Sequence, residues 1–325
     1  MDVVGFQQTY DRLAANIERY VLGKHHVVEA ALICLLSRGH LLIEDNPGLG
    51  KTLLASCLAR SIEGASVHRI QFTPDLLPTD VIGTNVYLQN TGTFKFRHGP
   101  VFANIIVADE INRASPRTQS ALLEVMEEGQ VTFDGKTRSV PQPFVVVATQ
   151  NPVDTEGTYP LPEAQLDRFL MRIRIGYPDT SAERQLLDDD RRTIDASRLA
   201  PVVDIDTVQE MVATPARVRV DADMRNYLVK IVADTRELAT PSRNGTSPPL
   251  LLGASPRGSL ALMRAARARA ASLGRDYVIP EDIKALAIPV LAHRLVLRGG
   301  GGFTGTALRS EQIVQEILDR IPVPA

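Results

Sequence analysis

Cysteine is nearly absent from this sequence of 325 residues, which contains only Cys34 and Cys57. Two thiols do not make a disulfide framework of the kind that staples small secreted domains. Both lie in apolar segments of helical character, where a free cysteine behaves as a small buried hydrophobe. They also lack the spacing and the neighbouring ligands of a metal site. The cysteines therefore indicate a protein of the reducing cytosol.

An excess of charge of one sign is also missing. Lysine and arginine total 36 against 38 aspartates and glutamates, so the formal net charge is -2. This balance gives no bulk positive field for a nucleic acid or an anionic membrane, although it leaves room for a local basic patch. Aromatic residues make up 5% of the chain, and no stretch interleaves them with basic residues. Nothing here favours binding of nucleic acid.

Long apolar runs are absent as well. The most apolar stretch, 30–43, is interrupted by Arg38 and His40 and is too short to span a bilayer. Residues 1–20 contain several charged side chains and no uninterrupted apolar core, so they do not resemble a signal peptide. We expect a soluble cytoplasmic protein without a membrane span. Its length suits two domains of roughly one to two hundred residues each.

Five short apolar runs have the length of strands: 40–43, 67–72, 105–108, 144–148 and 170–175. Several are nearly continuous in valine, isoleucine and leucine, the pattern of parallel strands covered on both faces. Helical segments lie between them, at 52–62 and 115–128 among others, so the sequence predicts an α/β layer structure. Between residues 129 and 144, a segment with Asp134 and Gly135 at its centre predicts a β-hairpin.

The pattern changes after Tyr177 and Pro178, where no further buried strand is expected. Helices dominate instead, and five are predicted: 181–190, 206–213, 221–238, 256–273 and 280–297. We place a domain boundary at this change. It divides the chain into an α/β domain at 1–178 and an all-helical domain at 179–325.

The strongest chemical signal is Asp-Asn-Pro-Gly-Leu-Gly-Lys-Thr at 45–52, which directly follows the first strand and opens a helix. It resembles the Walker A loop, in which backbone N–H groups cradle phosphates, Lys51 reaches the outer phosphates and Thr52 offers a hydroxyl to magnesium. Asp45 stands where this pattern usually has its first glycine. A tight strand-to-helix turn without a ligand is the alternative. The predicted nucleotide-binding segment comprises Pro47, Gly48, Leu49, Gly50, Lys51, Thr52 and Leu53.

A second signal is the buried run 105–108 followed by Asp109 and Glu110. This resembles Walker B, in which the aspartate holds magnesium through water and the glutamate orients and deprotonates the attacking water. An adjacent Asp-Glu pair taken alone is commonly a solvated strand end or a helix start. Its place after Walker A, with one strand between the two, favours catalysis. We therefore predict Thr52 and Asp109 as metal ligands and Glu110 as the base of ATP hydrolysis.

Three longer segments make the resemblance specific: 69–83 (RIQFTPDLLPTDVIG), 99–132 with the Walker B strand, and 148–173. Together with the Walker A loop and Ser-Pro-Arg at 255–257, they extend across nearly the whole chain. The sequence resembles a MoxR-type AAA+ ATPase. This resemblance implies an αβα nucleotide-binding domain with a five-stranded parallel sheet, followed by a C-terminal all-helical lid. It also implies an insert near 86–98 and a hairpin near 131–140.

The resemblance further assigns roles to residues near the predicted nucleotide. Asn151, at the end of the fourth strand, matches sensor 1, which helps to position the attacking water. An asparagine that caps the turn before Pro152 is the alternative. Gly23 belongs to a segment, 21–24, that is similar to the adenine-contacting segment of AAA+ proteins. A simple helix-to-helix turn at Gly23 would look the same.

Two arginines complete the implied set. Arg168 matches the finger that reaches the γ-phosphate of a neighbouring subunit. An isolated arginine at this position would most often pair with Asp167 or Glu163. Arg257 opens a predicted helix of the lid and matches sensor 2, with a plain surface arginine at a helix start as the alternative.

Proteins of this type are ring-forming, chaperone-like remodellers that are often paired with partners bearing von Willebrand factor A domains. They are linked to maturation or metal-cofactor insertion in client enzymes. The resemblance therefore implies ATP and Mg²⁺ as cofactors, a homo-oligomer with a hexamer as the expected size, and a protein client. Two other function classes fit the same motifs: a nucleotide-gated assembly scaffold with slow hydrolysis, and a nucleic-acid-stimulated motor. The balanced charge and few aromatics speak against the motor.

Overall fold

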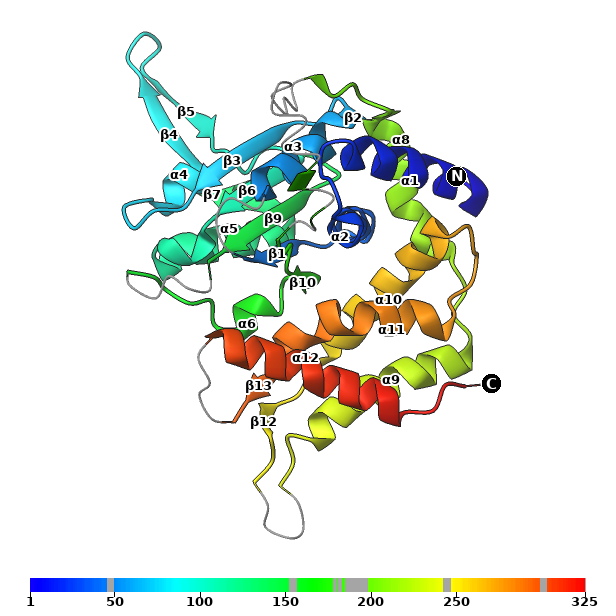
Figure 1. Ribbon diagram of the computed structural model, residues 1–325. Helices are drawn as coiled ribbons and strands as arrows, with labels where there is room; N and C mark the ends of the chain where they lie inside the picture. Colours follow the sequence, from blue (N-terminus) through cyan, green and yellow to red (C-terminus); the bar gives the residue numbers. More distant parts are fainter. Residues whose placement is uncertain are drawn as a thin grey trace.

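A five-stranded parallel sheet forms the centre of the α/β part (Figure 1). The computed structural model describes residues 1–45, 50–151, 157–177, 180, 183–184, 198–241, 247–298 and 303–324. The sheet has the order β10-β1-β9-β6-β3, and every neighbouring pair is parallel. All five expected strands are confirmed with small shifts of their ends. They are β1 (Leu41–Glu44), β3 (Val67–Gln71), β6 (Ile105–Asp109), β9 (Val145–Gln150) and β10 (Met171–Ile173).

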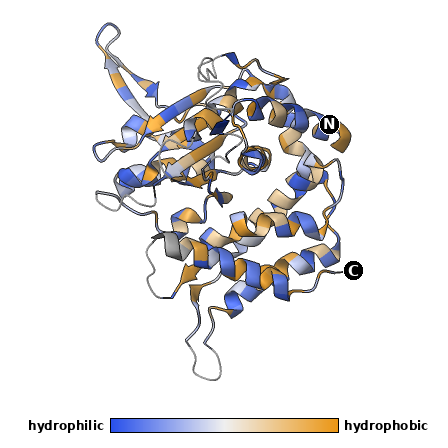
Figure 2. Cartoon of the chain, in the orientation of Figure 1, coloured by the Kyte–Doolittle hydropathy of each residue, from blue (hydrophilic) through white to orange (hydrophobic). Residues whose placement is uncertain are grey.

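Both faces of the sheet are covered, which explains the nearly continuous apolar runs. Every residue of β1, β6 and β9 is buried, and apolar residues dominate these central strands (Figure 2). Since alternate side chains point to opposite faces, Ile43 and Val147 pack into one core cluster, and Ile106 and Val146 into a second. The covering helices are α2 (His25–Leu36) and α3 (Lys51–Arg60) on the first face and α5 (Pro116–Glu128) on the second.

Local signals set the ends of α5. Ser115 caps its start by accepting a hydrogen bond from the Thr118 N–H, and Pro116 takes the first helical position. Gly129 ends the helix with a φ of 64°, in the left-handed region that glycine adopts without strain. Both boundaries agree with the sequence. Shorter connections are α4 (Pro78–Ile82), α6 (Glu163–Leu166) and a 3₁₀ turn (Ile111–Arg113).

Two antiparallel hairpins lie beside the sheet, and one of them projects from the molecule (Figure 1). The expected hairpin near 131–140 turns at Asp134 and Gly135, which have φ values of 53° and 70°. The insert expected near 86–98 is the projecting hairpin. The Arg138 guanidinium lies 3.9 Å from the centre of the Phe96 ring and joins the two. Their strands are β7 (Gln130–Phe133), β8 (Lys136–Ser139), β4 (Gly83–Leu88) and β5 (Thr93–His98).

Helices dominate the C-terminal part, as expected. They are α8 (Ile205–Ala213), α9 (Ala222–Glu237), α10 (Pro256–Ser272), α11 (Pro280–Leu291) and α12 (Phe303–Arg320), with a 3₁₀ turn (Thr214–Arg217) after α8. The helix expected at 181–190 falls almost entirely outside the described residues. α12 is an addition to the expected set. Within the described ranges, no helix combines the length and the apolar character that a membrane crossing requires.

One helix prediction is wrong in its last six residues, 292–297. The helix expected at 280–297 ends at Leu291, because the chain passes through a 3₁₀ turn (Ala292–Arg294) into β13 (Val296–Leu297). β13 pairs antiparallel with β12 (Leu250–Leu252). Strands this short give no alternating or continuous apolar run, so the sequence pattern does not separate them from a continuing helix.

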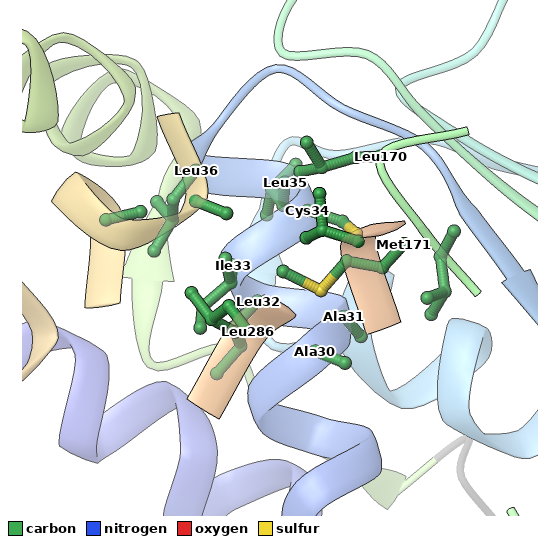
Figure 3. Close-up of a cluster of buried hydrophobic side chains, with 14 of the residues drawn as sticks. Ala30, Ala31, Leu32, Ile33, Cys34, Leu35, Leu36, Leu170, Met171 and Leu286 are labelled. Atoms are coloured by element: carbon green, nitrogen blue, oxygen red, sulfur yellow. The ribbon is translucent and has the colours of Figure 1, made fainter. Parts of the chain in front are cut away.

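The helical part shares a core with the sheet. Figure 3 shows side chains of α2, from Ala30 to Leu36, beside Leu170 and Met171 at the edge of the sheet and Leu286 of α11. The N-terminal helix α1 (Val3–Glu18) contacts α10. The expected boundary near residue 178 stays a prediction. A further link across it is the parallel pair β2 (Ile62–Glu63) and β11 (Val203–Asp204).

Candidate active site

A cavity of about 230 Å³ opens where β3, β6 and β9 end and α3 begins. The carboxyl ends of parallel strands meet at one edge of a sheet, and ligands of such folds bind there. The predicted nucleotide-binding residues of the Walker A loop that the structure describes, the two Walker B carboxylates and the sensor 1 residue Asn151 all line this cavity. Its full lining is Gly50, Lys51, Thr52, Leu53, Arg69, Gln71, Asp109, Glu110, Thr149 and Asn151.

The start of α3 faces this cavity. Gly50 precedes the helix with a φ of 83°, and among the described residues no side chain caps the helix start. A Cβ at this position would meet nothing within 4 Å, so the backbone conformation, and not a lack of space, requires glycine here. The N–H groups of an uncapped helix start and the helix dipole together favour an anion such as phosphate. Pro47, Gly48 and Leu49 lie outside the described residues.

Lys51 lies among carboxylates. Its Nζ donates a hydrogen bond to the main-chain carbonyl of Asp45. Burial lowers the pKa of the Lys51 ammonium below its usual value, while the negative charges of Asp45, Asp109 and Glu110 oppose that shift. The Asp45 carboxylate itself accepts a hydrogen bond from the Gly176 N–H at 2.6 Å and does not line the cavity. The residue that replaces the usual glycine therefore leaves the cavity open.

The carboxylate of Asp109 is the most densely contacted group of the site. Only 6% of Asp109 is exposed. Its Oδ2 accepts a hydrogen bond from Arg69 Nε at 2.6 Å and lies 3.4 Å from the Thr52 hydroxyl, while its Oδ1 lies 3.3 Å from the Thr149 hydroxyl. Thr52 and Asp109 thus offer a hydroxyl and a carboxylate oxygen side by side. Such oxygens are the ligands that Mg²⁺ prefers.

Glu110 is held in a defined position next to Asp109. Its backbone adopts the left-handed conformation with φ 56° and ψ 49°, which is uncommon for a residue with a Cβ. Its N–H donates to the Thr149 hydroxyl at 3.0 Å. The Glu110 carboxylate, 30% exposed, accepts a hydrogen bond from Gln71 Nε2 at 3.1 Å and forms an ion pair with Arg113 Nε at 3.1 Å. Asn151 completes this side of the cavity. The geometry fixes a carboxylate at the mouth of the cavity.

Four contacts of the two carboxylates are not identified from the sequence: Arg69, Gln71, Arg113 and Thr149. A weak signal exists for the first two. They lie two residues apart at the end of a strand, so they share one face of it. Which carboxylate they contact depends on the parallel register of β3 with β6, where Gln71 is opposite Asp109.

Gly23 lies outside this cavity. Its φ of 67° lets the chain turn between α1 and α2, which is the alternative that the sequence left open. The adenine contact assigned to this segment stays a prediction.

Comparison with known proteins agrees with this geometry. Residues 40–171 match the ATPase family associated with various cellular activities (AAA), and residues 245–317 match the AAA lid domain. The chain is 48% identical over 309 residues to the uncharacterized protein YeaC of Bacillus subtilis. The aligned region covers 95% of this chain and 93% of YeaC. It is 42% identical over 317 residues to Chaperone MoxR1 of Mycobacterium tuberculosis. That alignment covers 97% of this chain and 82% of MoxR1. The chain belongs to the MoxR family of AAA+ ATPases.

A solved structure shares the fold of this MoxR-family chain over its full length. The crystal structure of a candidate ATPase from Cytophaga hutchinsonii is 38% identical in sequence and superimposes with a TM-score of 0.89. The superposition covers 99% of this chain and 97% of the other. The expected αβα domain with a five-stranded parallel sheet and a helical lid is confirmed.

Two residues of the MoxR pattern lie away from the cavity. Arg168 Nε contacts Glu127 Oε2 at 2.8 Å, and Arg257 contacts the other oxygen, Glu127 Oε1. Arg168 therefore forms an ion pair, as expected for an isolated arginine, but its partner is Glu127 and not Asp167 or Glu163. Asp167, the neighbour in sequence, instead pairs with Arg294 at 2.8 Å. In this MoxR-family chain, one glutamate at the end of α5 holds both predicted catalytic arginines together.

Proposed function

We propose that the chain binds ATP with Mg²⁺ in the cavity at the carboxyl edge of the sheet and hydrolyses it to ADP and phosphate. The observation that carries this proposal is the meeting of Lys51 and Thr52 with the acidic end of β6 in one cavity. Membership of the AAA+ ATPases supports it.

The residues present fit a nucleotide-bound magnesium ion. In the part of the chain that the structure describes, no three His, Cys, Asp or Glu side chains gather into a site that would hold a metal alone. Mg²⁺ is commonly held by one or two carboxylates together with substrate phosphates, which is what Thr52 and Asp109 would complete. When bound, the ion would neutralise negative charge on the phosphates. To contact the ion, Asp109 would give up the hydrogen bond that its Oδ2 accepts from Arg69.

Glu110 is the proposed general base. Gln71 and Arg113 hold its carboxylate at the cavity, where it can accept the proton of the attacking water. The amide of Asn151, on the adjacent strand end, helps to orient that water. Lys51 and the N–H groups at the start of α3 bind the phosphates and balance their charge.

The proposal requires more than one copy of the chain. Arg168 and Arg257 lie outside the Lys51 cavity of their own chain, which supports a role at the nucleotide of a neighbouring copy. We propose a homo-oligomer, with a hexamer as the expected ring. The trans contact of Arg168 would stabilise negative charge that develops during phosphoryl transfer.

A protein client is the proposed target of this ATPase. The β4-β5 hairpin exposes Tyr87 by 53% and Phe94 by 71%, with ring centroids 5.2 Å apart. Exposed apolar groups on a projecting hairpin favour contact with another protein. The relative named Chaperone MoxR1 supports a chaperone-like or maturation role. We also propose that the protein acts in the cytoplasm and that it has a partner with a von Willebrand factor A domain.

Replacement of Lys51 tests the nucleotide site. Lys51→Ala is expected to weaken ATP binding about 10- to 100-fold, because a charge-assisted contact to phosphate contributes about 1.5–3 kcal/mol. Titration with a fluorescent ATP analogue measures this affinity, and phosphate release from the wild-type chain with Mg²⁺ measures turnover. Lys136→Ala, which removes the same charge from the exposed β8, is the matched control. Unchanged affinity in Lys51→Ala, or no phosphate release by the wild-type chain, would contradict the proposal.

A further inference from the structure

The central strand β1 ends in a buried carboxylate. Its first three residues are apolar, whereas the fourth is Glu44, which is only 2% exposed. Glu44 directly precedes the Walker A loop at 45–52, yet it does not line the Lys51 cavity. A charge that is removed from water is costly unless it is paired and hydrogen-bonded. The partners of Glu44 therefore indicate what this residue does in the fold.

Glu44 has one partner on each neighbouring strand. β1 lies between β9 and β10 in the sheet, and Glu44 is opposite Gln150 in the parallel register with β9. Its Oε1 accepts a hydrogen bond from Gln150 Nε2 at 2.8 Å. Its Oε2 forms an ion pair with Nη1 of Arg172, on β10, at 3.5 Å. Gln150 is buried and the Arg172 side chain is nearly so. We call these three residues the Glu44 cluster.

The two partners depend on Glu44 for their polar contacts. Gln150 Oε1 and Arg172 Nη2 are buried and have no hydrogen-bond partner among the described residues. Burial raises the pKa of Glu44, while the charges of Arg172 and Arg174 and the hydrogen bond from Gln150 oppose that shift. Loss of the carboxylate would leave a buried amide donor and a buried guanidinium without it, and such unsatisfied groups are costly. Glu44 therefore holds the cluster together.

The residues on either side of Gln150 belong to the nucleotide site. Thr149 and Asn151 both line the Lys51 cavity. The Thr149 hydroxyl accepts a hydrogen bond from the Glu110 N–H at 3.0 Å. Since side chains alternate along a strand, Gln150 points to the opposite face and does not line the cavity. The end of β9 thus carries two residues of the site on one face and a residue of the Glu44 cluster on the other.

A backbone hydrogen bond joins the same two strand ends. The Asp45 N–H donates to the Gln150 carbonyl at 3.3 Å, which is longer than the usual distance of about 2.9–3.0 Å for such a bond. The side-chain hydrogen bond between Gln150 and Glu44 is shorter and involves a charged acceptor, which makes it the stronger of the two. The position of the β9 end relative to the start of the Walker A loop therefore depends on Glu44.

We propose that Glu44 is a positioning residue of the nucleotide site, which acts through Gln150 and contacts neither the nucleotide nor the attacking water. By accepting the hydrogen bond from Gln150, it fixes the end of β9 against the loop that contains Lys51. Asn151 is thereby held where it can orient the attacking water, a role that rests on the proposed function. Rates are sensitive to such placement, because a shift of about 1 Å can cost about 10²-fold.

Two variants of matched size and charge test this role. Both carry Arg172→Met, so that neither contains an unpaired buried guanidinium. The first adds Glu44→Gln, whose amide oxygen still accepts from Gln150, and the second adds Glu44→Leu, which has no acceptor. The first is expected to keep kcat within about threefold of wild type, and the second to lose at least about tenfold. ATP affinity should stay within about twofold in both, because Lys51 and the start of α3 are unchanged.

Two kinetic results would overturn the proposal. One is an equal kcat in the Glu44→Gln and Glu44→Leu chains, since the acceptor would then have no effect on the reaction. The other is a parallel loss of kcat and ATP affinity in the Glu44→Leu chain, which would indicate a general distortion of the cavity. Absent turnover in the wild-type chain would refute the proposed function instead.

Hydrogen–deuterium exchange without nucleotide gives a readout that does not depend on turnover. Amides at the end of β9 should exchange faster in the Glu44→Leu chain than in the Glu44→Gln chain, because the strand end has lost a contact to β1. Amides of β6 should exchange equally in both. Unchanged exchange at the end of β9 would show that Glu44 does not hold this strand, whatever the turnover.

Asn16→Leu is the control for loss of a buried hydrogen bond. Asn16 Nδ2 donates to the Ser61 hydroxyl at 3.1 Å, away from the Lys51 cavity, so this change should lower the melting temperature and keep kcat. A loss of kcat equal to that of the Glu44→Leu chain would assign the effect to stability alone. If the Glu44→Leu chain does not fold, Gln150→Met removes the donor while Glu44 stays paired with Arg172. It should lower kcat equally, and full kcat in Gln150→Met contradicts the proposal.

Discussion

The Glu110→Gln variant is expected to bind ATP as the wild-type chain does and to hydrolyse it about 10²–10⁴ times more slowly. Glutamine keeps an oxygen that can accept from Gln71 and Arg113, so the side chain stays in place. It cannot take a proton from the attacking water. Lys51 and the start of α3 are untouched, so the phosphates are still bound. Phosphate release and nucleotide affinity, measured on the same preparation, separate the two effects.

Glu128→Gln is the matched control, because it makes the same chemical change at an exposed residue of α5. It is expected to keep wild-type turnover. A Glu110→Gln variant that hydrolyses ATP as fast as Glu128→Gln would remove Glu110 from the role of base. Equal loss in both variants would indicate a general effect of lost negative charge and would contradict the specific role as well.

The sheet could be predicted from the sequence because its strands are buried on both faces. A run such as Ile105 to Ala108 has the length of a strand and is rich in β-branched residues, which separates it from the longer buried apolar run of the helix α2, Ala30 to Leu36. The helix α12 shows the opposite case. Ile313 and Ile317 are buried and lie one helical turn apart, so this segment has the periodicity of an amphipathic helix. The glycine run 299–302 directly before it is typical of a loop, so no further helix was predicted there.

The chemistry of the site could be predicted where it follows from position along the chain. Asp109 ends β6, Asn151 directly follows β9, and Lys51 and Thr52 begin the helix that comes after β1, so they meet at the same edge of the parallel sheet. The partners of Asp109 and Glu110 could not be predicted in the same way. The hydrogen bond from Arg69 depends on strand register, which no local pattern specifies.

The partner of Arg168 depends on tertiary packing in a similar way. Glu127 precedes it by 41 positions, on the helix α5, and contacts it at 2.8 Å. Asp167 and Glu163 are nearer in sequence, but Asp167 forms its ion pair with the buried Arg294. A buried guanidinium left without a counter-ion would be costly, so it takes the adjacent carboxylate. Arg168 therefore pairs with Glu127, whose side chain is more exposed than that of Asp167.

Arg168→Ala is expected to assemble normally and to hydrolyse ATP about 10³–10⁵ times more slowly, the usual effect of removing an arginine finger. Loss of the ion pair with Glu127 does not explain such a change. The two side chains are 29% and 34% exposed, and pairs this accessible to water contribute only about 0–1 kcal/mol. Glu127→Gln breaks the same pair and keeps Arg168, so it should retain turnover. Equal inactivity of the two variants would make the ion pair, and not the finger, the cause.

Mixing the two inactive variants tests whether Arg168 acts on a neighbour. In a mixed assembly, some interfaces join a chain with intact Glu110 to a chain with intact Arg168, and these interfaces contain a complete site. Partial recovery of phosphate release is therefore expected when Arg168→Ala and Glu110→Gln chains are combined. Arg168→Ala combined with Lys51→Ala should recover through the same interfaces, because it again pairs an intact cavity with an intact arginine. Co-assembly without any recovery would place Arg168 outside the neighbour's site, since shared sites must form once the variant chains lie side by side.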